Sequence, residues 1–377
     1  MRIGIVTPGF SSSEADWCVP ALLDLVRELA RRHDVWVLAL RYPHRRDRYA
    51  VAGARVEALG GADRRGPRRL PLLYQAVRAI GREAKARPFD VLQAFWAHEP
   101  GVVVTTAGRL LKTPTVVSMH GGELASLPDI GYGGQLSAVN RLLIRHALQR
   151  ADAVTAVSHF LAGLAKEYLG ALRTRVLPLG VDTNRFHPAP VDGGAPKLAG
   201  QPSFLNVASL SAVKDQDTLL RAFQCARRPL PAARLHLVGD GDRRAALERL
   251  AVELGIDEAV RFHGAVPHDR LAPYYRGADL CVVSSRFEGM PVVALEAAFC
   301  GLRTVGSAVG LLPEIADHST TVSPHDPDAL GALLVTEARR PKGFPPPGDI
   351  SRERLDAEYG LQACVARLTG LYQSLCR

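Results

Sequence analysis

The sequence of 377 residues contains no apolar run near the roughly 20 residues that a membrane-spanning helix needs. Its first ten residues also lack the long apolar core of a signal peptide. From these two absences we expect a cytoplasmic protein, either free or held at the inner face of the membrane by surface charge.

The sequence offers little for disulfide or metal chemistry. Its six cysteines form no Cys-x-x-Cys pair and lie mostly in apolar segments, so we expect them to be reduced and buried. Two Asp-x-Asp pairs occur. Asp240 and Asp242 read as a turn, whereas Asp326 and Asp328 precede an apolar run as a helix cap would. We therefore predict neither a metal site nor a cofactor.

Positive charge is concentrated in one stretch. The formal net charge of the chain is +9, and residues 41–70 hold nine arginines, from Arg41 to Arg69, against three acidic residues. Such a stretch is either a flexible, solvated loop or a surface for an anionic partner, such as an anionic membrane or an acidic acceptor. We expect no nucleic acid, because surfaces that bind it usually interleave aromatic with basic residues.

Strand and helix patterns alternate along the chain. A strand is expected at residues 2–8, a helix at 19–30 and a second strand at 35–40. This order at the start of a chain indicates a parallel, Rossmann-like sheet, and Asp16 is placed to cap the helix. A second strand-helix series follows a Pro- and Gly-rich linker, so the sequence predicts two α/β domains.

The most informative stretch is residues 284–298. A short β-rich run precedes it, Gly289 allows the backbone to turn, and Pro291 suits the first position of a helix. Glu288 then lies on the loop, and Glu296 lies inside the helix, eight positions later.

The start of this helix suits an anion. The free N–H groups of Met290, Val292 and Val293 would point toward a phosphate. Glu296 lies roughly 7 Å further along the axis, at ~1.5 Å per residue, where it would accept from ribose hydroxyls. Glu288 would hold sugar hydroxyls, so the spacing fits a nucleotide diphosphate sugar. The alternative is a pair of solvated glutamates, one on a surface loop and one on a helix.

The strand, Glu-Gly-Met-Pro at 288–291, the small-residue helix, Gly301 and Thr-Val-Gly at 304–306 together resemble the nucleotide-sugar motif of retaining family-4 glycosyltransferases. The resemblance spans nearly the whole chain. It implies the α/β fold called GT-B, in which two Rossmann-like domains with parallel sheets face each other across a cleft. The implied parts are an acceptor-binding domain at 1–186, a linker at 187–202, a nucleotide-sugar-binding domain at 203–348, and helices at 349–377 that pack back on the first domain.

The resemblance also implies roles for single residues. His120, in a His-Gly pair directly after a strand, would face the donor sugar, and Lys214 would bind the donor diphosphate. Gly239 would lie near the nucleotide, and the backbone of Gly264 and Val266 would hold the base. No side chain is placed as a general base, so the leaving phosphate would itself receive the acceptor proton.

Some positions depart from the family pattern. Asp16 and Trp17 stand where a Gly-Gly pair approaches the donor diphosphate, so Trp17 would instead line an acceptor pocket or pack in the protein. Ser209 replaces an arginine that faces phosphate in the family. We predict that Arg286, beside the Glu288 loop, compensates for that missing cation.

Residues 96–100, which include His98, Glu99 and Pro100, are expected to form a loop after the strand at residues 90–95. His98 and Glu99 are candidates for acceptor contacts, because ligands bind at the carboxyl ends of strands in open α/β sheets. The function implied by the resemblance is transfer of a sugar, with retention, to a hydroxyl of a glycan, lipid-linked or small-molecule acceptor. Two alternatives remain: a catalytically silent nucleotide-sugar-binding protein, and a sugar-nucleotide epimerase or hydrolase of the same fold.

Overall fold

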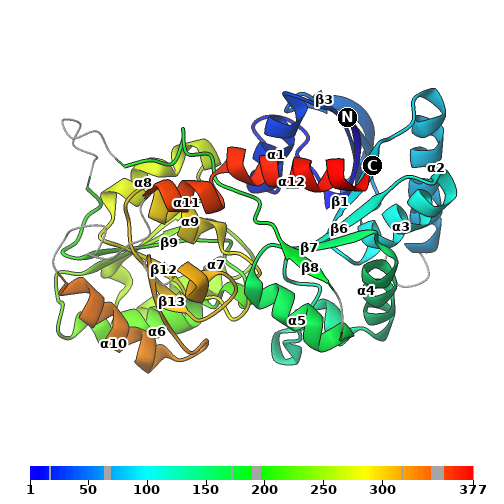
Figure 1. Cartoon of the computed structure of the whole chain (residues 1–377). Coiled ribbons are helices and arrows are strands. Elements are labelled where there is room, and N and C mark those ends of the chain that lie inside the picture. The colour runs from blue at the N-terminus through cyan, green and yellow to red at the C-terminus, as the bar shows by residue number, and fades with distance from the viewer. Residues whose placement is uncertain are drawn as a thin grey trace. The chain divides into compact units, whose positions relative to one another are not determined.

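The computed structural model of the chain describes residues 1–16, 18–62, 69–170, 173–188, 197–315, 318–340 and 352–376 (Figure 1). Two compact units make up the chain: Met1–Gly180 with Tyr359–Arg377, and Val181–Glu358. Within the described ranges, no helix is both long enough and apolar enough to cross a membrane.

The first unit is built on an eight-stranded sheet in the order β3-β4-β2-β1-β5-β6-β7-β8. All neighbouring strands are parallel except β3 and β4. Every residue of β5 and β6 is buried, as expected for a parallel sheet that is covered on both faces. The strands are β1 (Arg2–Gly9), β2 (Asp34–Tyr42), β3 (Arg46–Val51), β4 (Ala54–Leu59), β5 (Val91–Phe95), β6 (Thr115–Met119), β7 (Ala153–Ala156) and β8 (Thr174–Val176).

The helices of this unit follow the predicted alternation with the strands. They are α1 (Pro20–Ala30), α2 (Leu70–Ala86), α3 (Glu99–Leu111), α4 (Ala138–Arg150), α5 (His159–Leu169) and α12 (Leu361–Leu375). In α1 the buried residues include Leu22, Val26 and Leu29, at the helical spacing seen in the sequence. The prediction that Asp16 caps α1 is wrong, because the helix begins at Pro20 with Val19 as its N-cap residue.

Part of the arginine-rich stretch is regular structure and not a loop. Its residues 46–59 form the antiparallel hairpin of β3 and β4, which adds an edge to the parallel sheet. The turn consists of Ala52 and Gly53, both with positive φ (52° and 73°). Residues 63–68 of the stretch lie outside the described residues.

The second unit contains a six-stranded sheet in the order β11-β10-β9-β12-β13-β14, parallel throughout. Its core is formed by buried apolar residues that include Phe204, Phe223, Leu235 and Val282. The strands are β9 (Ser203–Val207), β10 (Arg234–Val238), β11 (Val260–Gly264), β12 (Leu280–Val283), β13 (Thr304–Ser307) and β14 (Ser319–Val322). The helices are α6 (Gln216–Arg227), α7 (Arg244–Glu253), α8 (Ala272–Gly277), α9 (Val292–Phe299), α10 (Pro327–Ala338) and α11 (Arg352–Tyr359).

The end of the chain is divided between the two units. All of α11 except Tyr359 belongs to the second unit, whereas α12 belongs to the first. Figure 1 shows α12 in red beside α1, with which it is in contact. The Tyr372 hydroxyl on α12 donates to Gln93 Oε1 on β5 at 3.2 Å, which ties this helix to the first sheet.

Candidate functional site

The order of the second sheet places its topological switch point between β9 and β12. The chain runs from β9 outward to β10 and β11, and from β12 outward in the opposite direction to β13 and β14. Ligands of open α/β sheets bind at such a switch point, at the carboxyl ends of the strands. The loop after β9 carries Lys214, and the loop after β12 carries Glu288.

These two loops are joined by hydrogen bonds. Lys214 Nζ lies 2.5 Å from Glu288 Oε1. The backbone N–H of Arg286 donates to the Val213 carbonyl at 2.8 Å, and the Ser284 hydroxyl donates to the Lys214 carbonyl at 2.8 Å. The sequence therefore identified two residues, 74 positions apart, that the structure brings into direct contact.

The Lys214 and Glu288 side chains are partly accessible, with exposed fractions of 27% and 13%. Glu288 Oε1 also accepts from the Ser285 hydroxyl at 2.7 Å. An ammonium group has three donors, so Lys214 keeps two N–H bonds for a ligand while it holds Glu288. This arrangement places a cation and an acceptor of hydroxyl groups side by side.

Helix α9 begins one residue later than predicted. Pro291 is its N-cap residue, with a non-helical ψ of 90°, and not the first helical residue. The Pro291 carbonyl accepts from Ala294 N–H at 2.9 Å. The backbone N–H groups of Val292 and Val293 precede that first bond, so this end of the helix keeps the free donors on which the predicted anion site depends. Gly289 and Met290, just before it, are buried.

Glu296 is buried inside α9, with 3% of its surface exposed. Its Oε2 accepts from the Tyr275 hydroxyl at 2.6 Å, and its Oε1 lies 2.6 Å from His268 Nε2. Burial is the main cause of a Tyr275 pKa well above the usual range, so the phenol keeps its proton and donates a hydrogen bond to Glu296. The sequence analysis missed both Tyr275 and His268.

The loop that was predicted to lie near the nucleotide follows β10, and the loop that was predicted to hold the base follows β11. Gly239 N–H donates to the Gly264 carbonyl at 2.8 Å. Gly239 has a φ of 137°, and a Cβ there would lie 1.9 Å from the Ala208 carbonyl oxygen, so only glycine fits. Val266 is half-buried beyond these glycines.

Ser209, at the end of β9, is exposed and places its hydroxyl 3.3 Å from that of Ser211. Its carbonyl accepts from Gln216 Nε2 at 3.0 Å, which fixes the loop. Arg286 is half-buried on the neighbouring Glu288 loop. Its role as a replacement cation stays a prediction.

In the first unit the switch point lies between β1 and β5. Asp16, in the loop after β1, accepts from the Ser12 N–H at 2.6 Å, the Ser12 hydroxyl at 2.7 Å and the Tyr42 hydroxyl at 2.9 Å. Its carboxylate therefore fastens this loop to the end of β2, which is its role in place of the predicted helix cap. Trp17 lies outside the described residues.

His120 follows β6 directly, as predicted. Its ring packs on those of Phe95 and Trp96, with centroids 5.3 and 4.8 Å apart. Its Nε2 is buried and has no hydrogen-bond partner among the described residues. Burial lowers the pKa of His120 to about 3, so the ring is neutral near pH 7. A neutral imidazole with an unused buried nitrogen is suited to hydrogen-bond a ligand hydroxyl.

Glu99 lies on a helix and not on a loop, which corrects the prediction that it contacts an acceptor. It is the first residue of α3, is buried, and receives two hydrogen bonds from Arg41 at 2.8 and 2.9 Å. Arg69 lies 3.7 Å from it. His98 caps the helix, because its Nδ1 accepts from Glu99 N–H at 2.9 Å. Both His98 and Glu99 therefore have structural partners. The guanidinium groups of Arg41 and Arg69 are more exposed than Glu99 and are better placed to contact an acceptor.

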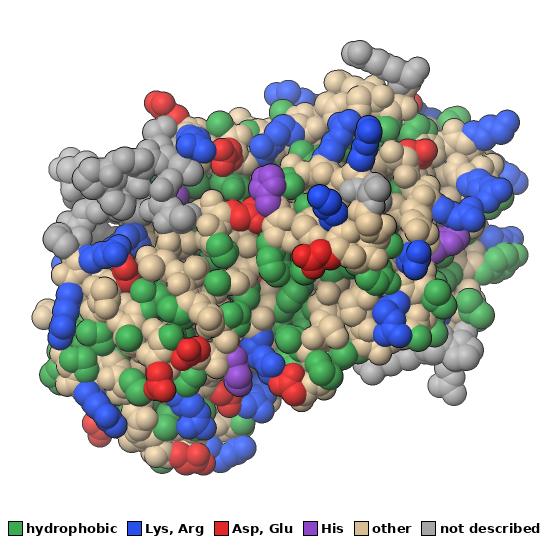
Figure 2. Space-filling model, turned by 60° about the horizontal axis from the view of Figure 1, so that its bottom comes forward, with side chains coloured by type: hydrophobic (Ala, Val, Ile, Leu, Met, Phe, Trp, Pro, Cys, Tyr) green, Lys and Arg blue, Asp and Glu red, His purple; other side chains and the backbone are tan. Residues whose placement is uncertain are grey.

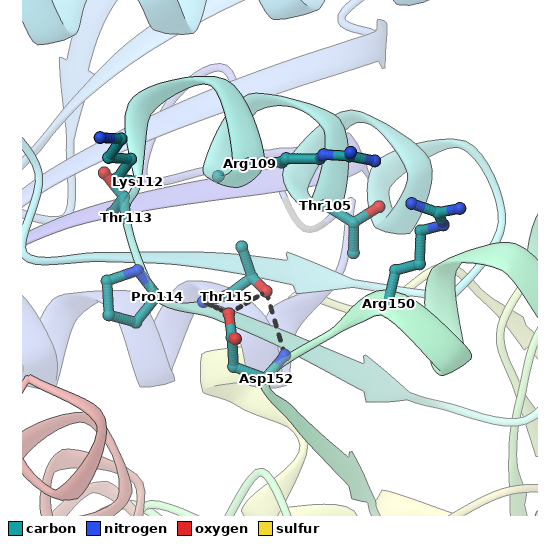
Figure 3. Close-up of a pocket in the computed structure, with 9 residues that line it drawn as sticks. Thr105, Arg109, Lys112, Thr113, Pro114, Thr115, Arg150 and Asp152 are labelled. Atoms are coloured by element: carbon teal, nitrogen blue, oxygen red, sulfur yellow. Dashed lines mark hydrogen bonds between the residues drawn. The ribbon is translucent and has the colours of Figure 1, made fainter.

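A separate pocket of ≈ 440 Å³ opens at the other end of β6, by Thr115 (Figure 3). It is lined by Arg109, Lys112 and Arg150, and Figure 3 shows Asp152 held by Thr115. The three cations belong to the carboxyl ends of α3 and α4, whose dipoles they complement. The helix ends thus account for this charge without a ligand.

The two Asp-x-Asp pairs have structural partners at their first residues. Asp326 caps α10 by accepting from Ala329 N–H at 2.9 Å, as predicted. Asp240 accepts from Gly241 N–H at 2.8 Å and lies 3.6 Å from Arg244. Among the residues that the structure describes, no group of three or more His, Cys, Asp and Glu could hold a metal ion.

Two family models match the chain: "Glycosyltransferase Family 4" at residues 21–185 and "Glycosyl transferases group 1" at residues 201–336. One relative is the GDP-mannose-dependent alpha-(1-6)-phosphatidylinositol monomannoside mannosyltransferase of Mycobacterium tuberculosis, 29% identical over 294 residues, which are 73% of each chain. Another is the D-inositol 3-phosphate glycosyltransferase of Thermomonospora curvata, 34% identical over 326 residues, which are 75% of this chain and 74% of the relative.

Solved structures show the same fold at lower identity. The sucrose-phosphate synthase of Thermosynechococcus elongatus aligns with a TM-score of 0.79 at 21% identity and covers 99% of this chain and 98% of its own. Anabaena HepE in complex with UDP-glucose aligns with a TM-score of 0.71 at 19% identity over the whole of both chains. The predicted pair of Rossmann-like domains of the GT-B type is thereby confirmed.

Proposed function

The chain belongs to glycosyltransferase family 4, and from this premise we propose that it moves a sugar from a nucleotide diphosphate sugar to an acceptor hydroxyl with retention at the anomeric carbon. The observation that carries the proposal is the contact between Lys214 and Glu288 at the switch point of the second sheet, beside the start of α9. A cation, helix N–H groups and a hydroxyl acceptor are the groups that a diphosphate sugar requires.

In the proposed mechanism the leaving diphosphate is stabilised as its bond to the sugar breaks. Negative charge then develops on phosphate, where Lys214 and the N–H groups of Val292 and Val293 are fixed in advance. Glu288 orients the sugar hydroxyls, and neutral His120 serves as a further hydrogen-bonding group for the sugar. The departing phosphate takes the proton of the acceptor hydroxyl.

For the donor we propose GDP-mannose as the first candidate, with UDP-glucose as the second. The M. tuberculosis relative is named as GDP-mannose-dependent, and the HepE structure contains UDP-glucose. We further propose that no divalent metal takes part, because Asp240 and Asp326 have structural partners and Lys214 supplies the positive charge. Loss of turnover in excess EDTA, restored by Mg²⁺ or Mn²⁺, would contradict this.

For the acceptor we propose a molecule that carries a phosphate. Arg41 lies 2.8 Å and Arg69 lies 3.7 Å from the carboxylate of Glu99, which comes shortly after β5, so two guanidinium groups gather at the carboxyl ends of β2 and β5. Arg69 Nε is buried and has no hydrogen-bond partner among the described residues. The relatives named for phosphatidylinositol monomannoside and inositol 3-phosphate both use phosphorylated acceptors.

We also propose that the first unit binds an anionic membrane surface. Leu70 and Tyr74 of α2 are 63% and 64% exposed. A groove of ≈ 780 Å³ between α2 and the β3–β4 hairpin contains Arg46, Arg48 and Arg78. Figure 2 shows Lys and Arg side chains dense along the right of the view, which belongs to the first unit. Flotation with vesicles tests this: binding should require anionic lipid and weaken with salt.

A transfer assay tests the proposed function. Labelled GDP-mannose and UDP-glucose would be incubated with phosphatidylinositol, its monomannoside or inositol 3-phosphate, and with water alone. Labelled acceptor is the expected product. Release of free sugar without acceptor would favour a hydrolase, a changed sugar on the nucleotide would favour an epimerase, and binding without any turnover would favour a catalytically silent protein.

A further inference from the structure

The buried carboxylate of Glu296 is held by neutral donors from two other elements. Tyr275, on α8, is 1% exposed and donates to Oε2 at 2.6 Å. His268, in a short 3₁₀ turn at His268–Arg270, approaches Oε1 with its Nε2 at 2.6 Å. These residues lie 21 and 28 positions before Glu296, so no local sequence pattern links them to it.

A third residue fixes which nitrogen of His268 carries the hydrogen. Arg185 Nη1 lies 2.9 Å from His268 Nδ1. A guanidinium group can only donate, so Nδ1 accepts and the ring hydrogen is on Nε2, facing Glu296. His268 therefore points its N–H at Glu296 as a neutral donor. Its imidazole ring lies between the positive charge of Arg185 and the carboxylate.

Packing holds the two donors in place. The ring of Phe186, which is 1% exposed, lies 5.3 Å from that of His268 and 5.9 Å from that of Tyr275. Each donor has its position fixed by a packed aromatic residue, and each meets a different oxygen of Glu296. Their hydrogen bonds occupy one acceptor position on each oxygen and leave one on each for a ligand.

Burying the carboxylate of Glu296 lowers the stability of the fold unless the carboxylate binds a ligand. A carboxylate taken out of water without a cation in direct contact is unfavourable, and an apolar side chain of the same size would avoid that cost. Two unused acceptor positions on one buried carboxylate match the two neighbouring hydroxyls of a ribose. The remaining 3% of exposed surface is the part that such a diol would cover.

We propose that Tyr275 and His268 are positioning residues that orient the carboxylate of Glu296 so that it accepts hydrogen bonds from both ribose hydroxyls of the nucleotide. The inference rests on the proposed function, because it requires a nucleotide donor. It adds that recognition of the ribose depends on two contacts with Glu296: that of His268, which Arg185 orients, and that of Tyr275. In this proposal all three residues act through Glu296 and not by touching the nucleotide.

Calorimetric titration with nucleotide diphosphates tests whether His268 and Tyr275 position Glu296 for the ribose. GDP and UDP, each with its 2′-deoxy and 3′-deoxy forms, would be titrated into the unaltered protein and into Tyr275→Phe, His268→Leu and His268→Gln. The Phe variant removes only a hydroxyl. The Gln variant keeps an N–H donor near the position of Nε2, whereas Leu removes it.

With the ribose nucleotide, Tyr275→Phe and His268→Leu should each weaken binding about five- to tenfold, and His268→Gln should recover most of the loss. Each variant removes the donor to one carboxylate oxygen of Glu296. For the deoxy nucleotide that lacks the ribose hydroxyl bound by that oxygen, the variant should weaken binding hardly at all. Thermal unfolding of each variant shows whether it is folded.

Equal weakening of ribose and deoxy forms would overturn the inference, since it would mean that Tyr275 and His268 only support the fold. Unchanged binding of the ribose form in the variants would overturn it as well. If neither GDP nor UDP bound the unaltered protein, the proposed function would fail together with the inference. If the unaltered protein binds a nucleotide diphosphate but the variants behave in either of the two ways above, only the positioning role of Tyr275 and His268 fails.

Discussion

Lys214 and Glu288 neutralise each other across the ends of β9 and β12. Because both side chains are partly exposed, the pair by itself contributes little to stability. Its position matters more: Glu288 lies three residues before Pro291, the N-cap residue of the helix that would hold phosphate, and Lys214 is in direct contact with Glu288.

Replacing Lys214 by methionine should therefore damage donor binding more than folding. The variant removes one charge-assisted hydrogen bond to phosphate, about 1.5 to 3 kcal/mol, which corresponds to roughly ten- to a hundredfold in donor affinity. Steady-state kinetics should show a higher donor KM and a lower kcat. Lys166→Met, on the exposed surface of α5, is the matched control and should leave both unchanged. A normal donor KM in Lys214→Met would remove Lys214 from the site.

At this scale the sequence was informative where one motif carried the chemistry. Glu288 and Lys214 were found because each matches a family position, and His120 because it ends a strand. Tyr275, His268 and Arg185 were missed, since their relation to Glu296 exists only after folding. Glu99 was misplaced because Pro100 was read as part of a loop, whereas proline is well suited to the first turn of α3.

The loop after β13 is an element whose shape the donor site requires. Gly310 has a φ of 55°, and a Cβ there would lie 2.8 Å from the carbonyl oxygens of both Glu288 and Gly289. Gly310→Ala should push the Glu288 loop away and weaken binding of the nucleotide sugar. Gly370→Ala is the control, because nothing lies within 4 Å of a Cβ at that position in α12.

Thermal unfolding and donor titration distinguish the two glycine variants. Gly370→Ala should keep donor affinity and be stabilised by about 0.5–1 kcal/mol, the usual gain in a helix interior. Gly310→Ala should be destabilised and should bind the donor more weakly. Unaltered donor affinity in Gly310→Ala would show that the Glu288 loop tolerates displacement.

Most elements were predictable from apolar periodicity, and the errors have physical causes. Helix α9 begins after Pro291 because that residue adopts a non-helical ψ. The β3–β4 hairpin was missed because its turn is Ala52-Gly53, which lacks the Asn or Asp that usually marks a two-residue turn with positive φ. Strand β3 is half exposed, and its arginines give it no run of apolar residues by which a strand could be predicted.

Across the whole molecule, buried histidines make stability depend on pH. Burial, with a smaller effect of His236, lowers the pKa of His263 to about 4, and burial lowers that of His120 to about 3. The unfolded chain binds these protons near pH 6.5, so it gains protons first as pH falls. Stability should be full above about pH 6.5 and decline between about 6.5 and 4.

The midpoint of thermal unfolding, measured at pH 7.5 and pH 5, checks this. His263→Gln keeps a donor for His236, whose other nitrogen donates to the Ala199 carbonyl, but it does not titrate. The decline on acidification should be smaller in this variant. An equal decline in both proteins would assign the effect to other groups.

The two-domain architecture followed from strand-helix alternation and the linker composition, and the family followed from residues 284–306. The structure divides the chain at Gly180 and Val181, near the predicted boundary at 186, and returns residues from Tyr359 onward to the first unit. The sequence placed the C-terminal helices on the first domain only through the family resemblance, because long-range contacts such as that of Tyr372 with Gln93 leave no local pattern.

We expect the second unit to bind a nucleotide diphosphate sugar with Glu288 at the sugar. Thermal unfolding with a panel of nucleotide sugars and free nucleotide diphosphates, on the unaltered protein and on Glu288→Gln, tests this binding, because a ligand of the native state raises the midpoint. We predict that one nucleotide sugar stabilises the unaltered protein more than its nucleotide diphosphate does. That difference should vanish in Glu288→Gln, while stabilisation by the diphosphate remains. No stabilisation by any nucleotide would show that the second unit is not a donor site, and an undiminished difference in Glu288→Gln would show that Glu288 does not hold the sugar.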